Sequence, residues 1–470
     1  MLFDVAALLI TSAALGPAAE ASVAPANIQI SQVVDLPVYG APSNSHSVVP
    51  IDPAAVGHPV SVSMFRVTHV SVESLDTLSG MELLRELSVL PSSQVASYLS
   101  SHPSVETDLI AHPPAVQQVN DWWSGLSASE QEALATSAPR LVGNLDGLPV
   151  TVRDRSNRAW VSQSISTLSA SISGADGRAI AQTDQHSLHM LKQIDAALKQ
   201  PKSKSAPVRS LLEVDASGSG KAAIVLGNLQ TADYVTYMVP GMFFTVDGQM
   251  GDWTGDAADL YAQQVKWLHK LSAVDPADKG KTVAVVAWMG YQTPDLTNIG
   301  SLDLAYKGRD ELAHAVQGLQ ALRAADEPYT TIVGHSYGST AALMALTEYN
   351  FSVDALVLVG TPGSSAQSVD ALHVRNHNVF VGAAAWDPVP ASAYFGSDPS
   401  SPSYGAKVLG VGGAVDPITG KQLGASIGHN GYFDVGSESI RNMALIGIDH
   451  PELAMTGSPK DKTRTLSIEH

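Results

Sequence analysis

The sequence of 470 residues contains no cysteine. This absence excludes disulfide bonds, cysteine nucleophiles and thiolate metal sites. It says little about compartment, because a chain of this length can bury a large core without disulfides. Basic residues are also few, 27 Lys and Arg against 45 Asp and Glu, which gives a formal net charge of -18. Since no long basic run is present, we expect no nucleic-acid partner and attribute the acidity to solubility.

Metal-binding and cofactor-binding motifs are missing as well. The sequence has no His-Glu-x-x-His pattern and no acidic loop of the calcium-binding type. Its glycine clusters lack the flanking strand and helix signals of a phosphate-binding loop. We therefore expect neither a metal nor a cofactor.

The N-terminal segment has an apolar stretch that is too short and too interrupted for a membrane span, and no other stretch qualifies. Val5–Gly16 followed by Ala19–Ser22 is similar to the apolar part and cleavage site of a signal peptide. The first residues, however, carry Asp4 and no Lys or Arg. A cleaved signal over residues 1–21 and an ordinary apolar arm are both open, and with them a secreted or a cytoplasmic location.

The composition along the chain predicts three parts. Residues 1–60 are rich in Pro, Ser and Val and indicate an extended arm, whereas residues 61–204 carry helical patterns and indicate a helical domain. Within it, Ser127 and Glu130 have the spacing of a capping box. The segment Pro201–Pro207 reads as a linker to an α/β domain at residues 205–470.

In this last part, short apolar runs alternate with helical patterns. The first runs are KAAIVLG, YVTYMVPG and TVAVVAWMG, and the last expected strand is AKVLGVGG at Ala406–Gly413; a helix is expected over Gly255–Ala273. Apolar runs separated by helices are typical of a mostly parallel sheet covered on both faces. In such α/β sheets, ligands bind beyond the carboxyl ends of the strands.

A Gly-x-Ser-x-Gly motif occurs twice, centred on Ser336 and on Ser426. The apolar run TTIV ends directly at Gly334, and the helical pattern STAALMALTEY begins after Gly338. A sharp strand–turn–helix of this kind presents a nucleophilic serine at the end of a sheet. Ser426 lacks both flanks and is expected in a loop. We therefore take Ser336 as the candidate nucleophile, with a purely structural turn as the alternative.

A serine nucleophile needs a histidine base that is oriented by a carboxylate, in the chain order Ser, acid, His. Asp387 directly follows the strand pattern NVFVGAAAW, so it is expected at the same edge as Ser336. His429 lies between the last expected strand and the last helix. The other residues after Ser336 fit the order or the edge less well: Asp354, Asp370, His373, His377, His450 and His470. A capping or turn aspartate and a surface-loop histidine are the alternatives.

An oxyanion hole would complete the site. One donor is expected from the backbone N–H of Tyr337, after the nucleophile, and a second from the loop after the strand YVTYMV. There Gly241 allows close approach of a backbone, so we select the N–H of Met242, with Phe243 as the alternative donor. A plain turn is the other interpretation. Gly241, Phe243 and His335 are the expected substrate contacts, and we expect Pro390–Gly405 to border the substrate entrance.

Several blocks of the sequence, in order, resemble an actinobacterial α/β-hydrolase family long described as a domain of unknown function. They are VAVVAWMGYQTP, IVGHSYGST, AAAWDPVP and GHNGYFDVGSESIRNMA, and the likeness covers roughly residues 115–450. The resemblance implies an α/β-hydrolase fold and a serine hydrolase with Ser336, Asp387 and His429 as its triad. It implies no substrate.

These observations predict a hydrolase of carboxylic esters that acts through an acyl-enzyme on Ser336. The substrate would be a small-molecule or lipid-like acyl ester. Amide or thioester hydrolysis is the nearest alternative, because a triad does not discriminate among acyl groups. A non-catalytic binding protein on a hydrolase scaffold is the alternative of another class. The oligomeric state is left open.

Overall fold

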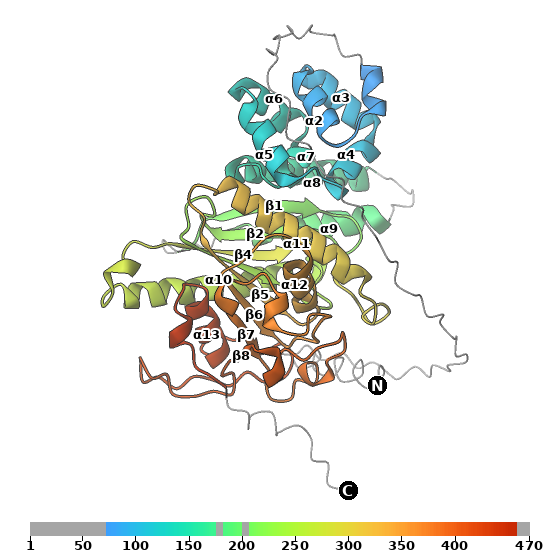
Figure 1. The fold of residues 1–470 in the computed structure, drawn as a ribbon. Coiled ribbons are helices and arrows are strands. Elements are labelled where there is room, and N and C mark those ends of the chain that lie inside the picture. Colours follow the sequence, from blue (N-terminus) through green and yellow to red (C-terminus); the bar gives the residue numbers. More distant parts are fainter. Residues whose placement is uncertain (1–71, 175–181, 200–205, 458–470) are drawn as a thin grey trace, which may run out of the picture. The chain divides into compact units, whose positions relative to one another are not determined.

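The computed structural model describes residues 72–174, 182–199 and 206–457 (Figure 1). The expected arm at 1–60, with its signal-like segment, lies outside the described residues. Of the linker expected at Pro201–Pro207, only the last two residues are described, and they lead into the first strand.

Helices make up the first part of the described chain, as the sequence predicted. A 3-10 helix, η1 (Val72–Thr77), is followed by α2 (Gly80–Val89), α3 (Ser92–Ser101), α4 (Pro103–Ala111), α5 (Val116–Gly125), α6 (Ala128–Ser137), α7 (Pro139–Asn144), α8 (Val150–Ser173) and α9 (Gln182–Ala197). The predicted capping box is confirmed at α6, where the Ser127 side chain accepts from the N–H of Glu130 and the Glu130 carboxylate accepts from the N–H of Ser127.

The second part is an eight-stranded sheet with the order β1-β2-β4-β3-β5-β6-β7-β8. Its strands are β1 (Arg209–Asp215), β2 (Lys221–Gly227), β3 (Tyr234–Val239), β4 (Val283–Met289), β5 (Tyr329–His335), β6 (Ala355–Val359), β7 (Val379–Gly382) and β8 (Lys407–Val408). β2 runs antiparallel to β1 and β4, and all other pairs are parallel. The α/β-hydrolase fold expected from the sequence is confirmed.

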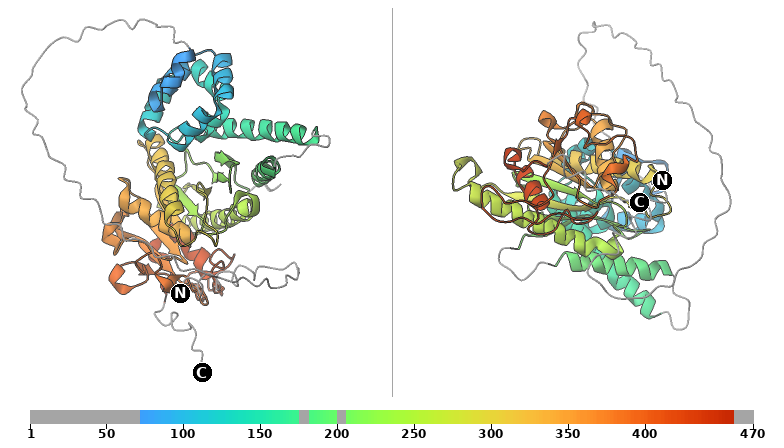
Figure 2. Two further views of the ribbon diagram at one scale, coloured as in Figure 1. Left: turned by 90° about the vertical axis from the view of Figure 1, so that its right-hand side faces the viewer. Right: turned by 90° about the horizontal axis from the view of Figure 1, so that it is seen from below.

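Helices cover the sheet on both faces: α10 (Val246–Leu271) and α13 (Glu438–Ile446) on one, α11 (Asp303–Leu322) and α12 (Tyr337–Glu348) on the other. The two views of Figure 2 show the long helices α10 and α11 on opposite sides of the strands. The arrangement follows from the strand sequences, which are apolar at successive positions and so bury side chains on both faces.

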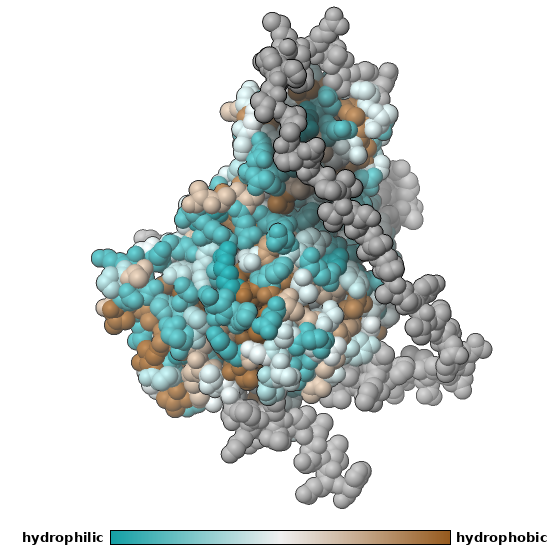
Figure 3. Space-filling model, in the orientation of Figure 1, coloured by the Kyte–Doolittle hydropathy of each residue, from teal (hydrophilic) through white to brown (hydrophobic). Residues whose placement is uncertain are grey.

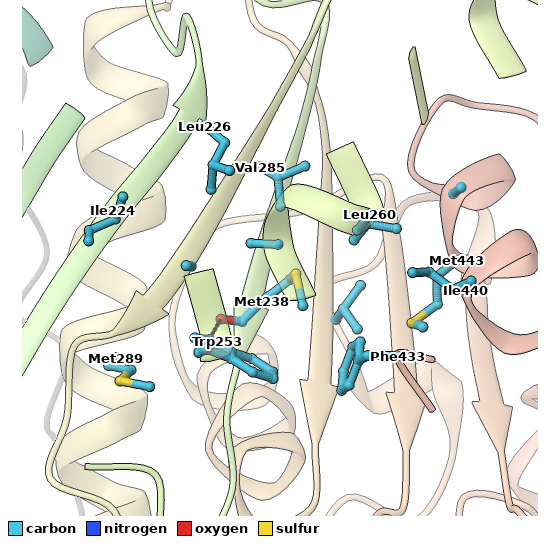
Figure 4. Close-up of a cluster of buried hydrophobic side chains, with 14 of the residues drawn as sticks. Ile224, Leu226, Met238, Trp253, Leu260, Val285, Met289, Phe433, Ile440 and Met443 are labelled. Atoms are coloured by element: carbon cyan, nitrogen blue, oxygen red, sulfur yellow. Dashed lines mark hydrogen bonds between the residues drawn. The ribbon is translucent and has the colours of Figure 1, made fainter. Parts of the chain in front are cut away.

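Alternate strand residues build two separate cores. Ile224, Met238 and Val285 point to the α10 and α13 side, where the Trp253 indole packs among them and donates to the Met238 carbonyl at 3.3 Å (Figure 4). Their neighbours Val225 and Tyr237 point to the α11 and α12 side. The sheet is thus held rigid from both sides, which fixes the strand ends that carry the candidate site.

Two element boundaries differ from the sequence predictions. The strand expected over Ala406–Gly413 pairs only at Lys407–Val408, because the chain then leaves the sheet and the N–H of Gly410 donates to the Met455 carbonyl. Helix α10 begins at Val246 rather than Gly255, because the Thr245 hydroxyl caps it by accepting from the N–H of Gly248.

Buried polar side chains of α8 join the helical part to the edge of the sheet. The guanidinium of Arg153 donates to the carbonyls of Gly143 and Leu212 and to the carboxylate of Asp146. Asn157, fully buried, donates to the carbonyls of Gly143 and Leu211. These contacts satisfy backbone carbonyls that the packing of α8 on β1 would otherwise leave unpaired.

We predict that Arg153→Ala lowers the free energy of unfolding by about 3 kcal/mol, because it removes the donor of the partly buried Asp146 carboxylate and of the Leu212 carbonyl, whereas the Gly143 carbonyl keeps its bond from Asn157. Arg155→Ala, two residues along the same helix, removes an exposed pair with Glu132 and should cost at most about 0.5 kcal/mol. Urea unfolding followed by circular dichroism measures both. Equal effects of the two substitutions would contradict this account of the junction.

On the face shown in Figure 3, hydrophilic side chains predominate and hydrophobic ones gather in separate patches. In the part of the chain that the structure describes, no helix combines the length and apolar character needed to cross a membrane.

Candidate active site

Ser336 lies in the sharp turn between β5 and α12, as the sequence predicted. β5 ends at His335, α12 begins at Tyr337, and Ser336 between them has φ 54° and ψ -131°. A positive φ is unfavourable for a residue with a side chain, and such strain is concentrated at functional sites. The N–H of Ser336 donates to the Val359 carbonyl of β6 at 3.0 Å, which ties the turn to the neighbouring strand.

The two glycines of the motif are required by close backbone contacts. A Cβ on Gly334 would lie 2.7 Å from the Cα of Ser339, and one on Gly338 would lie 2.2 Å from the Pro240 carbonyl oxygen. No side chain fits at either position without moving backbone. The expectation that a tight elbow needs small neighbours is therefore confirmed for this turn.

Ser336, His429 and Asp387 form one chain of hydrogen bonds, although they come from three separate segments. The His429 Nε2 is 2.7 Å from the Ser336 Oγ, and its Nδ1 is 2.9 Å from the Asp387 Oδ1. All three residues are buried, with exposed fractions of 5–7%. Because a carboxylate only accepts, Nδ1 of a neutral His429 carries the hydrogen, and the lone pair of Nε2 faces the serine hydroxyl.

The carboxylate of Asp387 has further donors. Its Oδ1 also accepts from the N–H of Val389 at 3.0 Å, and its Oδ2 accepts from the Tyr432 hydroxyl at 2.5 Å. Burial raises the pKa of Asp387, but the hydrogen bonds from His429, Tyr432 and Val389 outweigh burial and hold the pKa below its usual value. Asp387 is therefore kept as a carboxylate in an interior position.

Two residues of this arrangement were missed by the sequence analysis, namely Tyr432 and Gly360. Gly360 directly follows β6 with φ +61°, and a Cβ there would lie 3.0 Å from both the Asp387 Oδ2 and the His429 Cε1. The glycine after the run ALVLV was the available signal for Gly360. Tyr432 had none beyond its place three residues after His429.

The loop after β3 passes directly beside Ser336. A Cβ on Gly241 would lie 2.4 Å from the Ser336 Cβ and 2.9 Å from its Oγ, so only glycine fits there. The N–H of Phe243 donates to the Pro294 carbonyl at 3.1 Å and is already used. Among the described residues, no acceptor is recorded for the N–H groups of Met242 or Tyr337. Of the two N–H groups in this loop that the sequence offered as oxyanion donors, that of Met242 is available, whereas that of Phe243 is already used.

His335 was expected to contact substrate. In the structure its side chain is buried and packs against His429. It is 2% exposed, its Nε2 is 2.8 Å from the His429 carbonyl oxygen, and the two rings are 4.8 Å apart. Since the carbonyl only accepts, Nε2 carries the hydrogen. Burial, and then the neighbouring His429, lower the pKa of His335 to about 3, so this ring is neutral. Its contacts support the loop that carries His429.

The second Gly-x-Ser-x-Gly motif has no such setting. Ser426 lies in a loop between isolated bridges, and its N–H donates to the Val411 carbonyl. Its hydroxyl is fully buried and has no hydrogen-bond partner among the described residues. Within the described ranges, Ser426 is linked to the triad through the loop that also carries His429.

Two of the residues set aside in the sequence analysis lie in other networks. Asp354 precedes β6 at its amino end, where it binds Arg375 and accepts from the N–H of Thr330. His450 binds Asp278 and Glu452. Neither takes part in the hydrogen bonds around Ser336.

The segment Pro390–Gly405 lies at the Ser336 end of the sheet. The ring of Phe395 packs on the ring of Tyr337 at 5.6 Å, and its N–H donates to the Pro362 carbonyl. That this segment borders a substrate entrance stays a prediction. In the described part of the chain, no cluster of three or more His, Asp or Glu side chains is placed to hold a metal ion.

We predict that Gly360→Ala slows the reaction of Ser336 with an organophosphorus probe roughly 10- to 100-fold, because the new methyl group displaces Asp387 or His429. The matched control is Gly420→Ala. Gly420 has a similar φ of +67° but open space around its Cα. Both variants carry the cost of about 1 kcal/mol for a left-handed alanine, so any larger loss of thermal stability in Gly360→Ala comes from the added contact with Asp387 and His429. Equal labelling rates in the two variants would contradict the role assigned to the Gly360 contact.

Residues 215–397 match the model of a protein family described as alpha/beta hydrolase, a range that includes Ser336 and Asp387 and ends before His429. An uncharacterized protein of Mycobacterium tuberculosis is 29% identical over 379 residues, which cover 71% of this chain and 55% of that protein. One of Mycobacterium bovis is 27% identical over 223 residues, 46% of this chain and 82% of that protein. The chain thus spans about half the length of the first relative. The resemblance to an actinobacterial family of unknown function is confirmed.

Solved structures add a distant likeness. Carboxyl esterase 2 from Tuber melanosporum is 14% identical with a TM-score of 0.32, over 54% of this chain and 90% of that one. An S-formylglutathione hydrolase from Agrobacterium tumefaciens is 11% identical with a TM-score of 0.30, over 54% of this chain and 98% of that one.

Proposed function

We propose that this protein, which has the α/β-hydrolase fold, is a serine hydrolase that cleaves carboxylic esters through an acyl-enzyme on Ser336. The observation that carries the proposal is the hydrogen-bonded chain from Ser336 through His429 to Asp387, at a strained turn at the carboxyl end of β5. The match of residues 215–397 to a hydrolase family supports the same reading.

In the proposed reaction the Ser336 Oγ attacks the ester carbonyl, and its proton passes to the His429 Nε2. The imidazolium then gives this proton to the departing alcohol, which leaves an acyl group on Ser336. Water, deprotonated by His429, attacks the acyl group, and the carboxylic acid departs as the Ser336 hydroxyl is restored. Asp387 holds the Nδ1–H tautomer and stabilises the imidazolium charge.

The developing oxyanion needs donors that are fixed before the reaction begins. The N–H groups of Tyr337 and Met242 are the proposed pair, since neither has a recorded acceptor among the described residues and the loop at Gly241 touches Ser336. A donor in this position is worth about 3–4 kcal/mol of transition-state stabilisation. Gly241 allows the loop to come this close.

The test combines two probes on the full chain. A fluorophosphonate should label the protein at one serine, and nitrophenyl esters of increasing acyl length should be hydrolysed with a preferred length. Absence of both labelling and turnover in a folded sample would favour a non-catalytic binding protein on the hydrolase scaffold. Labelling together with faster cleavage of an amide or thioester than of the matched ester would favour the alternative hydrolase classes.

A further inference from the structure

The Tyr432 hydroxyl is placed between two groups whose hydrogen-bonding roles are fixed. The N–H of Ala384 lies 2.9 Å away and can only donate, so the phenol oxygen accepts from it. The Asp387 Oδ2 lies 2.5 Å away on the other side and, as a carboxylate oxygen, accepts. The hydroxyl hydrogen of Tyr432 is therefore directed at Asp387, because the other neighbour of the phenol oxygen can only donate.

One short turn supplies donors to both oxygens of the carboxylate. His429 donates to Oδ1 and Tyr432 to Oδ2, and the residues between them form a tight turn. Its tightness depends on Gly431, where a Cβ would lie 2.7 Å from the Ile427 carbonyl oxygen. The relative orientation of imidazole and carboxylate is thus set from one piece of backbone.

Resting on the proposed function, we propose that Tyr432 is a positioning residue of the reaction, which fixes the Asp387 carboxylate so that its Oδ1 faces His429. Without the phenol, Oδ2 would lose its hydrogen-bond donor, and the carboxylate could turn about its Cβ–Cγ bond. The imidazolium that forms during acyl transfer would then be less well stabilised. Tyr432 itself touches neither the serine nor the reacting carbonyl in this scheme.

The surroundings of the pair favour this role. Tyr432 is fully buried, and so is the Asp387 side chain. Burial, and then the adjacent Asp387, raise the pKa of Tyr432 well above its ordinary value, so the phenol keeps its proton. The titratable groups that act on the carboxylate are Tyr432 and His429, with the neutral ring of His335 behind them.

The test is Tyr432→Phe, with Tyr404→Phe as the matched control. Tyr404 is equally buried, and its hydroxyl has no hydrogen-bond partner among the described residues. With nitrophenyl acetate, Tyr432→Phe should lower kcat roughly 10- to 100-fold with little change in KM. The control Tyr404→Phe should change neither kcat nor KM. Wild-type kcat in a folded Tyr432→Phe protein would overturn the inference.

A second measurement does not depend on activity and separates this inference from the proposed function. The depressed pKa of Asp387 adds stability that is present above its unfolded pKa and is lost as the pH falls through the folded pKa. Tyr432→Phe raises that folded pKa. The difference in unfolding free energy between wild type and Tyr432→Phe should therefore be larger at pH 7 than at pH 3, whereas that of Tyr404→Phe should be the same. A pH-independent difference for Tyr432→Phe would overturn the inference even if the protein hydrolysed no ester.

Discussion

Ser336→Ala should abolish covalent labelling by a fluorophosphonate and lower ester turnover by roughly 10⁶-fold, because the variant has no atom to form the acyl-enzyme. The fold should persist, since alanine meets the same backbone cost at φ 54° that serine does. A residual rate above that of water is expected from the oxyanion donors and from binding. Probe labelling, turnover of a short nitrophenyl ester and thermal unfolding measure the three parts of this prediction.

Ser426→Ala is the control for this substitution, since it tests the second copy of the same motif. Its buried hydroxyl has no hydrogen-bond partner among the described residues, so its loss should leave labelling intact and change turnover only modestly. Full labelling of Ser336→Ala, or lost labelling in a folded Ser426→Ala, would contradict the assignment of the nucleophile.

Asp387→Asn should lower kcat roughly 10⁴-fold while the protein stays folded. The neutral amide no longer stabilises the imidazolium form of His429, and it no longer requires the hydrogen on Nδ1, so the lone pair that faces Ser336 is lost in part of the molecules. Labelling by the fluorophosphonate should slow in proportion. Turnover and labelling rate, both measured under the same conditions as for the wild type, test this expectation.

Asp354→Asn is the matched control, because it removes a carboxylate at the opposite end of the neighbouring strand. Asp354 is held by Arg375 and the N–H of Thr330, so the change should cost stability but leave kcat within a few fold. Comparable kcat losses in both asparagine variants would show that Asp387 acts through stability rather than through His429.

The fold was predictable because its signals are local. Strands such as β4, with seven buried residues, are continuous apolar runs, and the alternation with helical patterns then determines a parallel sheet. β1 was missed because its run RSLLEVD interrupts the apolar residues with Arg209 and Glu213, which an edge strand that is only partly buried can hold. The predicted start of α10, Gly255, was too late, because the first turns of the helix contain glycines, which disfavour a helix in sequence-based prediction.

Only those parts of the site that follow from chain order and from the positions of strand ends could be predicted from the sequence. Ser336, Asp387 and His429 each sit where a strand or its following loop ends, so their approach could be inferred from topology. Tyr432 and Gly360 contact the same carboxylate through geometry that no local pattern records. The contact of His335 with the His429 carbonyl could not be predicted for a related reason, because the direction of a side chain at a turn depends on the backbone angles of that turn.

The hydrogen bonds of the candidate triad join residues that are far apart along the chain. Ser336 and His429 are 93 positions apart, and His429 and Asp387 are 42 apart. Closing such loops costs chain entropy that local helices do not face, and contacts of this kind form slowly. The three side chains are brought together by the pairing of β5, β6 and β7 and by the turn before α13. Reactivity at Ser336 then reports on the folding of the whole C-terminal half of the sheet, and not merely on the presence of three residues.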